Sequence, residues 1–227
     1  LIEKSINWNN LNKKINSQKF LDQLCEKLQI KKEFNLKQFF GNYDKNNKFH
    51  LAYKKIGLNQ IKGVETLTLL KYLIYRIYRS LLRSIKFFRF NNNKMPIELL
   101  YDFSKAYNGY ENKIHRDTDF RVIIILIYLN ELDTTSSGGE LKIFKNISKT
   151  LKQYPDEKEI ELVEEIKPEP GKMVVMLNDY EFFHSTKKLE KLNGSRNFIY
   201  GGFTLLSGKN PYLKHHSSTK SAFHHYD

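Results

Sequence analysis

Cysteine is nearly absent from this chain, because Cys25 is the single cysteine among 227 residues. One thiol excludes an internal disulfide, and it excludes every zinc cluster that is built from several thiolates. Any bound metal must therefore be held by histidine, aspartate or glutamate side chains. A chain without disulfides is compatible with a reducing compartment, so we expect a cytoplasmic protein.

Long uninterrupted hydrophobic runs are also lacking, since charged residues interrupt the apolar stretches well before they reach membrane-spanning length. This excludes a protein with several membrane-spanning helices. Hydrophobic residues still make up 40% of the sequence and aromatic residues 14%, which is too much core-forming material for a disordered chain. At 227 residues the chain fits one globular domain, or one domain with an appended lobe.

Acidic residues are outnumbered by basic ones, with 25 Asp and Glu against 38 Lys and Arg, and the formal net charge is +13. Such a charge favours an anionic partner, such as nucleic acid, an acidic protein or a membrane surface. The lysines are scattered through the chain among many asparagines and do not form one stripe. The charge therefore supports no nucleic-acid partner specifically.

The first 95 residues have the spacing of helices. Leu21, Leu24 and Leu28 recur at three and four residues, as on one face of an amphipathic helix, and a second helical run covers residues 64–90. Between residues 67 and 90, cations recur every three or four positions on an otherwise apolar helix: Arg76, Arg79, Arg83 and Lys86. Such a helix either packs on a sheet with its cations reaching water, or lies on a membrane surface or an anionic partner. We favour the packed helix, and the frequent charges exclude a transmembrane span.

After Pro96 the pattern changes to short apolar or alternating runs that are separated by turn residues. Eight candidate strands follow one another without a helical pattern between them, at residues 97–107, 113–115, 122–129, 140–144, 161–166, 173–177, 182–185 and 196–206. This arrangement predicts a sandwich or jelly roll, and not a doubly wound sheet.

We therefore expect a mainly β fold with some α structure, divided into three parts. Residues 1–95 form a helical lobe packed on the sheet, residues 96–206 form a double-stranded β-helix (jelly-roll) core, and residues 207–227 form an exposed or loosely docked tail. The tail carries the pairs His215-His216 and His224-His225, but it offers no framework that would arrange them around a metal.

Three polar residues in the core region could meet around one metal ion. His115 and Asp117 are two apart, so in an extended strand both side chains point to the same side. His184 follows a later apolar strand, and jelly-roll strands that are distant in sequence become neighbours. Two histidines and one carboxylate leave three coordination positions open, as suits Fe(II). Zinc is the rival metal, and a surface ion pair is the alternative interpretation of the His-x-Asp pattern alone.

Arg196 stands at the start of the last apolar strand, twelve residues after His184. A buried guanidinium is costly without an anion, so we expect one beside it. That anion is either the far carboxylate of a co-substrate or an internal partner such as Glu140 or Glu181.

The sequence resembles the prolyl 4-hydroxylase-like branch of the Fe(II)/2-oxoglutarate oxygenases over about residues 101–205. The order of several features carries this resemblance: Gly109-Tyr110 before His115-Arg116-Asp117, Arg121 before the strand ending Tyr128-Leu129-Asn130, then Gly138-Gly139-Glu140-Leu141, Pro170-Gly171, His184 and Arg196.

The resemblance implies the roles of five residues. His115, Asp117 and His184 would bind Fe(II) as the catalytic metal ligands, and Arg196 would anchor the distal carboxylate of the co-substrate 2-oxoglutarate. Tyr128 would donate a hydrogen bond to that carboxylate, with a packed core tyrosine as an equal alternative. The implied reaction hydroxylates an unactivated C–H bond and releases succinate and CO2, with ascorbate as a reductant.

Several substrates and functions remain open at this point. The resemblance favours a prolyl residue in a peptide or protein, and a small metabolite, lipid or sugar is the alternative. From other classes, the chain could be a non-catalytic basic binding module on the same fold, or a zinc hydrolase. The complete ligand set argues against the module, and a hydrolase would leave Arg196 without an assigned anion.

The chain also departs from the family pattern. Tyr107 is offset from the position where relatives place a tyrosine near the co-substrate. Gly201-Gly202 stand where many relatives have a bulky residue, and they either widen the pocket or bend the strand. Arg121 matches a recurring position whose role the sequence does not assign.

Overall fold

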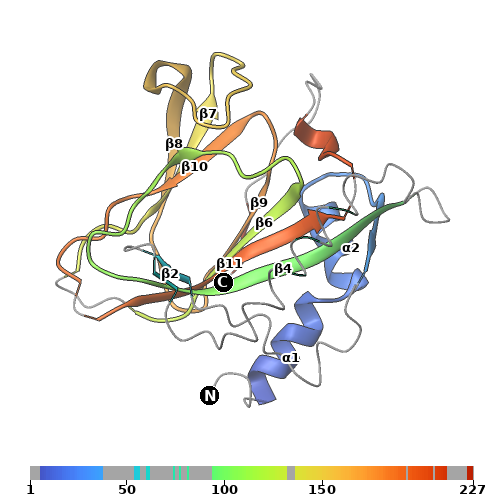
Figure 1. Cartoon of the computed structure of the whole chain (residues 1–227), viewed down its shortest axis with the longest axis horizontal. Coiled ribbons are helices and arrows are strands. Elements are labelled where there is room, and N and C mark those ends of the chain that lie inside the picture. The colour runs from blue at the N-terminus through green and yellow to red at the C-terminus, as the bar shows by residue number, and fades with distance from the viewer. Residues whose placement is uncertain are drawn as a thin grey trace.

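The computed structural model describes residues 6–37, 54–56, 60–61, 94–131, 136–192, 194–206, 208–213 and 224–226, together with Ile74, Ile77 and Leu81. Two β-sheets face each other, and two short helices lie beside the larger sheet (Figure 1). The mainly β jelly-roll fold that the sequence predicts is confirmed.

The larger sheet has four long or central strands and carries the core of the molecule. They are β4 (Met95–Ala106), β6 (Arg121–Tyr128), β9 (Met173–Leu177) and β11 (Arg196–Leu205). Their order is β9-β6-β11-β4, and every pairing among them is antiparallel. Strands that are distant in sequence therefore lie side by side, as a jelly roll requires.

The smaller sheet has the order β5-β10-β7-β8. Its strands are β5 (Asn112–His115), β7 (Leu141–Asn146), β8 (Ile160–Ile166) and β10 (Phe182–Thr186), and a short 3-10 helix, η3 (Glu157–Glu159), precedes β8. Each of the eight strands that the sequence predicts is present, with bounds that differ by a residue or two at most ends.

Strand β6 shows why the apolar runs of this chain are continuous. Ile123, Ile125 and Ile127 pack in a core that includes the N-terminal helices. Ile124, Leu126 and Tyr128 point to the opposite face, where they pack with side chains of the smaller sheet. Because both faces of the larger sheet are covered, its central strand must be apolar at nearly every position.

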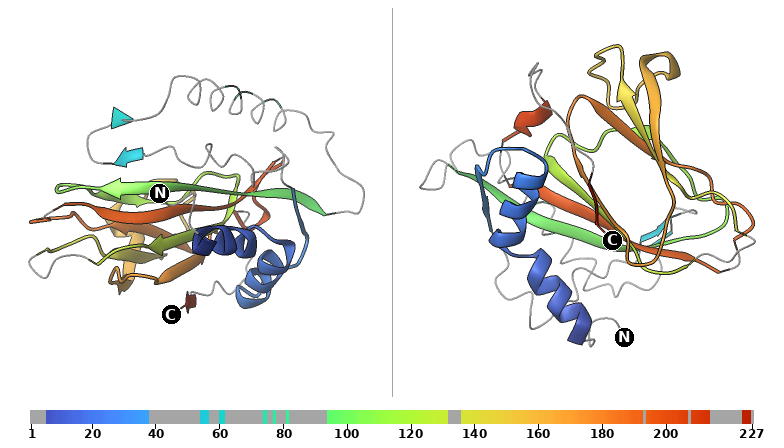
Figure 2. Two further views of the ribbon diagram at one scale, coloured as in Figure 1. Left: turned by 90° about the horizontal axis from the view of Figure 1, so that it is seen from below. Right: turned by 180° about the vertical axis from the view of Figure 1, so that it is seen from behind.

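The helices α1 (Ile6–Ile15) and α2 (Gln18–Lys27) cover the outer face of the larger sheet (Figure 2). The Ser17 side chain caps α2 by accepting a hydrogen bond from the backbone N–H of Phe20 at 3.2 Å. Leu21 and Leu24 are buried on α2, and the ring of Phe20 lies 6.4 Å from that of Phe203 on β11. The predicted amphipathic helix around Leu21–Leu28 is therefore confirmed.

Among the described residues before Met95, three short strands that the sequence did not predict extend the larger sheet. They are β1 (Phe34–Leu36), β2 (Lys54–Ile56) and β3 (Gln60–Ile61). Both β1 and β2 pair in parallel with β4, at its beginning and its end. They cover the outer edge of β4, where unpaired backbone groups would otherwise be exposed.

Most of the predicted helix at residues 64–90 lies outside the described residues. Ile74, Ile77 and Leu81 are helical, and each has more than half of its surface exposed. In the tail, η4 (Pro211–Leu213) is followed by β12 (His224–Tyr226), which pairs with the edge of β9. Among the described residues, no helix has the length and apolar character needed to cross a membrane.

Candidate active site

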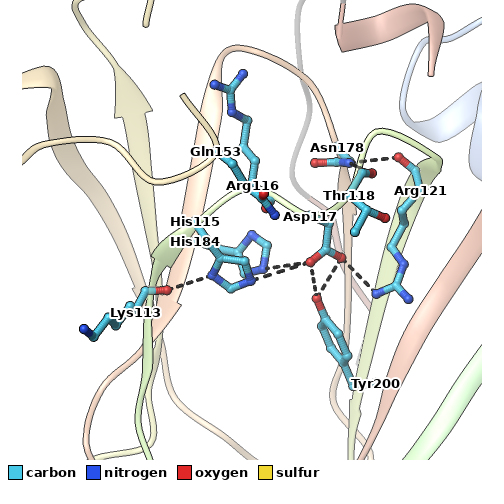
Figure 3. Close-up of polar contacts among 10 residues, drawn as sticks. All are labelled: Lys113, His115, Arg116, Asp117, Thr118, Arg121, Gln153, Asn178, His184 and Tyr200. Atoms are coloured by element: carbon cyan, nitrogen blue, oxygen red, sulfur yellow. Dashed lines mark hydrogen bonds and ion pairs between the residues drawn. The ribbon is translucent and has the colours of Figure 1, made fainter. Parts of the chain in front are cut away.

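His115, Asp117 and His184 converge at the end of the smaller sheet (Figure 3). His115 ends β5 and pairs directly with His184 on the neighbouring strand β10, so their ring centroids lie 4.4 Å apart. Asp117 follows two residues after His115. One ligand atom of each residue lies within 4.8 Å of the others, which is close enough to hold one metal ion.

A single carboxylate oxygen faces both imidazoles. The Oδ1 atom of Asp117 lies 3.6 Å from Nε2 of His115 and 4.0 Å from Nε2 of His184. The Nδ1 atom of His115 lies 2.7 Å from the backbone carbonyl of Lys113, which indicates that Nδ1 carries the proton and that the Nε2 lone pair faces the cluster. The buried Nε2 atom of His184 has no hydrogen-bond partner among the described residues.

The charges of this cluster suit a cation. Burial lowers the pKa of His184 to about 4, so this imidazole is neutral and able to ligate near pH 7. Burial alone would raise the pKa of Asp117, but the charge of Arg121 and the hydrogen bonds with His115 and Tyr200 hold it well below its usual range. The cluster therefore offers one negative charge and the neutral imidazole of His184, and His115 adds a second nitrogen ligand in its deprotonated form.

Two residues that the sequence did not assign orient Asp117. Arg121 donates from Nη1 to Oδ2 of Asp117 at 2.9 Å, and the hydroxyl of Tyr200 lies 2.7 Å from both carboxylate oxygens. The guanidinium also lies 5.2 Å from the centre of the Tyr200 ring. Since Oδ2 is held by Arg121, Oδ1 is the oxygen that is presented to the imidazoles (Figure 3).

The glycines next to Tyr200 allow its strand to approach both neighbours. A Cβ atom on Gly201 would lie 2.0 Å from the Leu100 carbonyl oxygen on β4. A Cβ atom on Gly202, which has a φ of +146°, would lie 1.8 Å from the Ile123 carbonyl oxygen on β6. Close backbone packing therefore explains these two glycines.

Arg196 lies in a second polar centre inside the same barrel. It is only 3% exposed, its Nη1 atom donates to the Gly139 carbonyl, and its guanidinium lies 4.5 Å from the centre of the Tyr128 ring. A Cβ atom on Gly139 would lie 2.4 Å from that Nη1 atom, which explains the glycine in the family pattern. Among the described residues no carboxylate forms an ion pair with Arg196, and Glu140 instead pairs with Lys187 at 3.7 Å.

This second centre has hydrogen-bond donors without acceptors. The buried Nε atom of Arg196 has no hydrogen-bond partner in the described part of the chain, and the buried hydroxyl of Tyr128 lies beside the Arg196 guanidinium without an acceptor for its own proton. Burial raises the pKa of Tyr128, so its hydroxyl stays protonated and can donate. Unpaired buried donors next to a guanidinium fit a carboxylate ligand.

Tyr110 is a further member of the second centre. Burial raises its pKa, and the Arg196 charge and a hydrogen bond with the Thr186 hydroxyl act in the opposite direction, so Tyr110 lies beside both groups. Thr186 and His184 are two residues apart on β10, a separation of about 7 Å along a strand. The second centre is therefore adjacent to the His-Asp-His cluster. Tyr107, in contrast, is 36% exposed.

Comparison with known proteins agrees with this geometry. Residues 101–202 match the family model of the 2OG-Fe(II) oxygenase superfamily. Residues 101–202 therefore form a 2OG-Fe(II) oxygenase domain. The resemblance to the Fe(II)/2-oxoglutarate oxygenases is thereby confirmed, and this domain uses Fe(II) and 2-oxoglutarate. The matched range contains both polar centres.

Among solved structures, three prolyl hydroxylases are similar to this oxygenase. A Pseudomonas putida prolyl-4-hydroxylase is 20% identical over 63% of this chain and 68% of its own, with a TM-score of 0.33. A Phytophthora capsici prolyl 4-hydroxylase is 16% identical over 62% and 39%, with a TM-score of 0.33. A Trichoplax adhaerens prolyl hydroxylase, in complex with a hypoxia inducible factor peptide fragment, is 19% identical over 67% and 60%, with a TM-score of 0.30.

These structural similarities are too low to support an argument about substrate. No curated protein shows significant sequence similarity to the oxygenase. The family assignment therefore rests on the family model, together with a ligand set that matches it.

Proposed function

We propose that the oxygenase binds Fe(II) through His115, Asp117 and His184, binds 2-oxoglutarate through Arg196 and Tyr128, and hydroxylates a prolyl residue in a peptide or protein. The observation that carries this proposal is the position of one Asp117 oxygen between two imidazole Nε2 atoms. Two histidines and one carboxylate on one side of an ion leave the other side open for ligands.

The residues present fit the metal. His184 keeps a buried, unpaired Nε2 atom with a lowered pKa, and the low pKa of Asp117 supplies a charge to balance a divalent cation. Arg121 and Tyr200 fix the carboxylate so that one oxygen is directed to the ion. When bound, Fe(II) with 2-oxoglutarate and dioxygen supplies the oxidation of the C–H bond, with release of succinate and CO2.

The residues present also fit the co-substrate. The buried donors of Arg196 and Tyr128 lack acceptors, and a carboxylate would supply them. Tyr110 lies beside Arg196 and forms a third wall of this centre. Tyr110 contacts Thr186, which is two residues from His184 on β10, so the Arg196 centre lies close to the metal cluster. A dicarboxylate could therefore bind Arg196 with one end and reach the metal cluster with the other.

The identity of the substrate, a prolyl residue, is the most specific part of the proposal. It rests on the order of motifs from Gly109 to Arg196, which is that of the prolyl hydroxylase branch. The family model supports an oxygenase and leaves the hydroxylated molecule open.

Succinate release tests both parts. The full chain is incubated with Fe(II), ascorbate and 2-oxoglutarate, either with proline-rich peptides or with a pool of small metabolites, lipids and sugars. We expect succinate and hydroxyproline from the peptides, and neither from His184→Ala. Turnover of a small molecule without turnover of any peptide would reject the prolyl substrate. No succinate under any condition would favour a binding module, and bound zinc with hydrolysis independent of 2-oxoglutarate would favour a hydrolase.

A further inference from the structure

Arg116 stands between two of the proposed metal ligands and has no role in the function described so far. In an extended chain, neighbouring side chains point to opposite sides, so His115 and Asp117 face the metal cluster and Arg116 points away from it (Figure 3). Its side chain is nonetheless buried, with 3% of the residue exposed. Because Arg116 forms no ion pair within 4 Å among the described residues, its buried guanidinium needs other partners.

The first partners lie in the loop that follows β7. The Nη2 atom of Arg116 donates to the carbonyl of Thr150 at 3.1 Å and also to the carbonyl of Lys152. The backbone N–H of Arg116 donates to the Gln153 carbonyl at 2.9 Å, and Nε2 of Gln153 donates back to the Arg116 carbonyl at 3.2 Å. Both the side chain and the main chain of Arg116 are therefore fixed to this loop.

The second partners lie on the segment that leads to His184. The guanidinium carbon of Arg116 lies 4.6 Å from the ring centre of Phe183 and 4.8 Å from that of Tyr180. Phe183 immediately precedes His184 on β10 and is buried. A planar cation against aromatic faces gains both stacking and electrostatic attraction, which an ammonium group on a flexible chain reproduces poorly.

Asn146 links the two sets of partners. Its Nδ2 atom donates to the carbonyls of Thr150 at 3.0 Å and Tyr180 at 2.8 Å, and its Oδ1 atom accepts from the Thr150 N–H at 3.0 Å. The loop after β7 and the segment before His184 are thus held to each other as well as to Arg116.

We propose that Arg116 is a positioning residue that fixes the two halves of the metal site relative to each other, an inference that rests on the proposed function. We call Arg116 with Thr150, Lys152, Tyr180 and Phe183 the Arg116 clamp. His115 and Asp117 are on one side of the clamp and His184 is on the other. Without the guanidinium, β5 and β10 keep their backbone pairing, but the ligand side chains lose the support that sets their separation.

Manganese binding tests the clamp without any need for a substrate. The dissociation constant of Mn(II) is measured calorimetrically for the full chain in the absence of 2-oxoglutarate, and thermal unfolding is measured without metal. We expect Arg116→Ala to bind Mn(II) about 10- to 100-fold more weakly than wild type, as is usual when the groups that support metal ligands are removed. Arg116→Lys keeps the charge but loses the planar stacking, and we expect a smaller loss in the same direction.

Asn12→Ala is the matched control. Asn12 is 3% exposed on α1, and its Oδ1 atom accepts a hydrogen bond from the Tyr101 hydroxyl at 2.5 Å, so its removal destabilises a part of the fold that does not contact the metal ligands. We expect this variant to unfold at a lower temperature and to bind Mn(II) as wild type does.

The outcomes separate the two proposals. If Arg116→Ala unfolds earlier but keeps a Mn(II) dissociation constant within twofold of wild type, Arg116 is only structural and the clamp is rejected. If Arg116→Ala does not fold, the Mn(II) dissociation constant of Arg116→Lys is used instead, and a wild-type value in Arg116→Lys rejects the clamp. If wild type itself binds no Mn(II), both the proposed metal site and the clamp are rejected.

Discussion

The two polar centres of the barrel differ in how their charges are balanced. In the metal cluster, Asp117 already has Arg121 and Tyr200 as partners, so the carboxylate is oriented before any ion arrives. In the second centre, Arg196 and Tyr128 keep buried donors that no described residue satisfies. The first centre is preorganised, whereas the second holds an uncompensated charge. Removal of a charge should therefore have opposite effects on stability in the two centres.

The largest effect is expected at the metal cluster. Asp117→Ala removes a proposed ligand, the only negative charge of the cluster and the carboxylate that Arg121 contacts. We expect complete loss of Mn(II) binding and of succinate release, together with a lower temperature of unfolding. The matched control is Asp119→Ala, which removes an exposed carboxylate two residues away. Mn(II) binding by Asp117→Ala at wild-type affinity would contradict the ligand assignment.

Arg196→Met is expected to weaken co-substrate binding strongly without lowering the melting temperature. Under the proposed function the substitution removes about two charge-assisted hydrogen bonds to the co-substrate. At roughly 1.5–3 kcal/mol each, their loss should raise the KM for 2-oxoglutarate at least about 100-fold. Because the unpaired guanidinium is costly to bury, the melting temperature without co-substrate should be unchanged or higher. Kinetics and thermal unfolding check both parts. Lys187→Met, which removes a half-exposed cation nearby, should change neither quantity.

The pH dependence of metal affinity sharpens the contrast between the two imidazoles. Burial lowers the pKa of His115, but the hydrogen bonds with Asp117 and the Lys113 carbonyl outweigh it and raise that pKa above its ordinary value of about 6.5. Burial lowers the pKa of His184 to about 4. As the pH falls below the His115 pKa, one proton competes with the metal, so Mn(II) affinity should fall about tenfold per pH unit. A hundredfold fall per unit between pH 6 and 5 would show that both histidines are protonated there.

The smallest effect is expected for Tyr128→Phe. The loss of one neutral donor to the co-substrate should raise the KM for 2-oxoglutarate about 2- to 10-fold, at roughly 0.5–1.5 kcal/mol per hydrogen bond. The melting temperature should change little, because the hydroxyl proton has no acceptor among the described residues. An unchanged KM would show that Tyr128 is only a core residue.

The sequence was sufficient for the parts of this molecule that depend on local pattern. Alternating or continuous apolar runs predicted the eight strands, and the two-residue spacing of His115 and Asp117 placed both side chains on one face. The strands β1 and β2 were missed, because three residues are too few to show a period and their pairing with β4 is set by tertiary contacts.

The side chains that contact the site residues could not be predicted from the sequence. Tyr200 contacts Asp117, which is 83 positions earlier in the sequence, and Arg116, which follows β5, contacts Phe183 on the neighbouring strand β10. Such contacts depend on register and side-chain direction, which a single sequence does not reveal. The sequence does carry a signal for Tyr110, since it directly follows Gly109 in the motif, whereas Tyr107 is the tyrosine that is offset from the family position.

Because His184 pairs directly with His115, binding of an ion at the proposed metal site depends on the alignment of β10 with β5. If β10 shifted by one residue against β5, His184 would turn to the opposite face of the sheet and Phe183 would take its place beside His115. Only the correctly aligned sheet can then bind metal, and by mass action a bound ion would increase the population of that alignment over shifted ones. Metal supplied during refolding should therefore raise the yield of the native pairing.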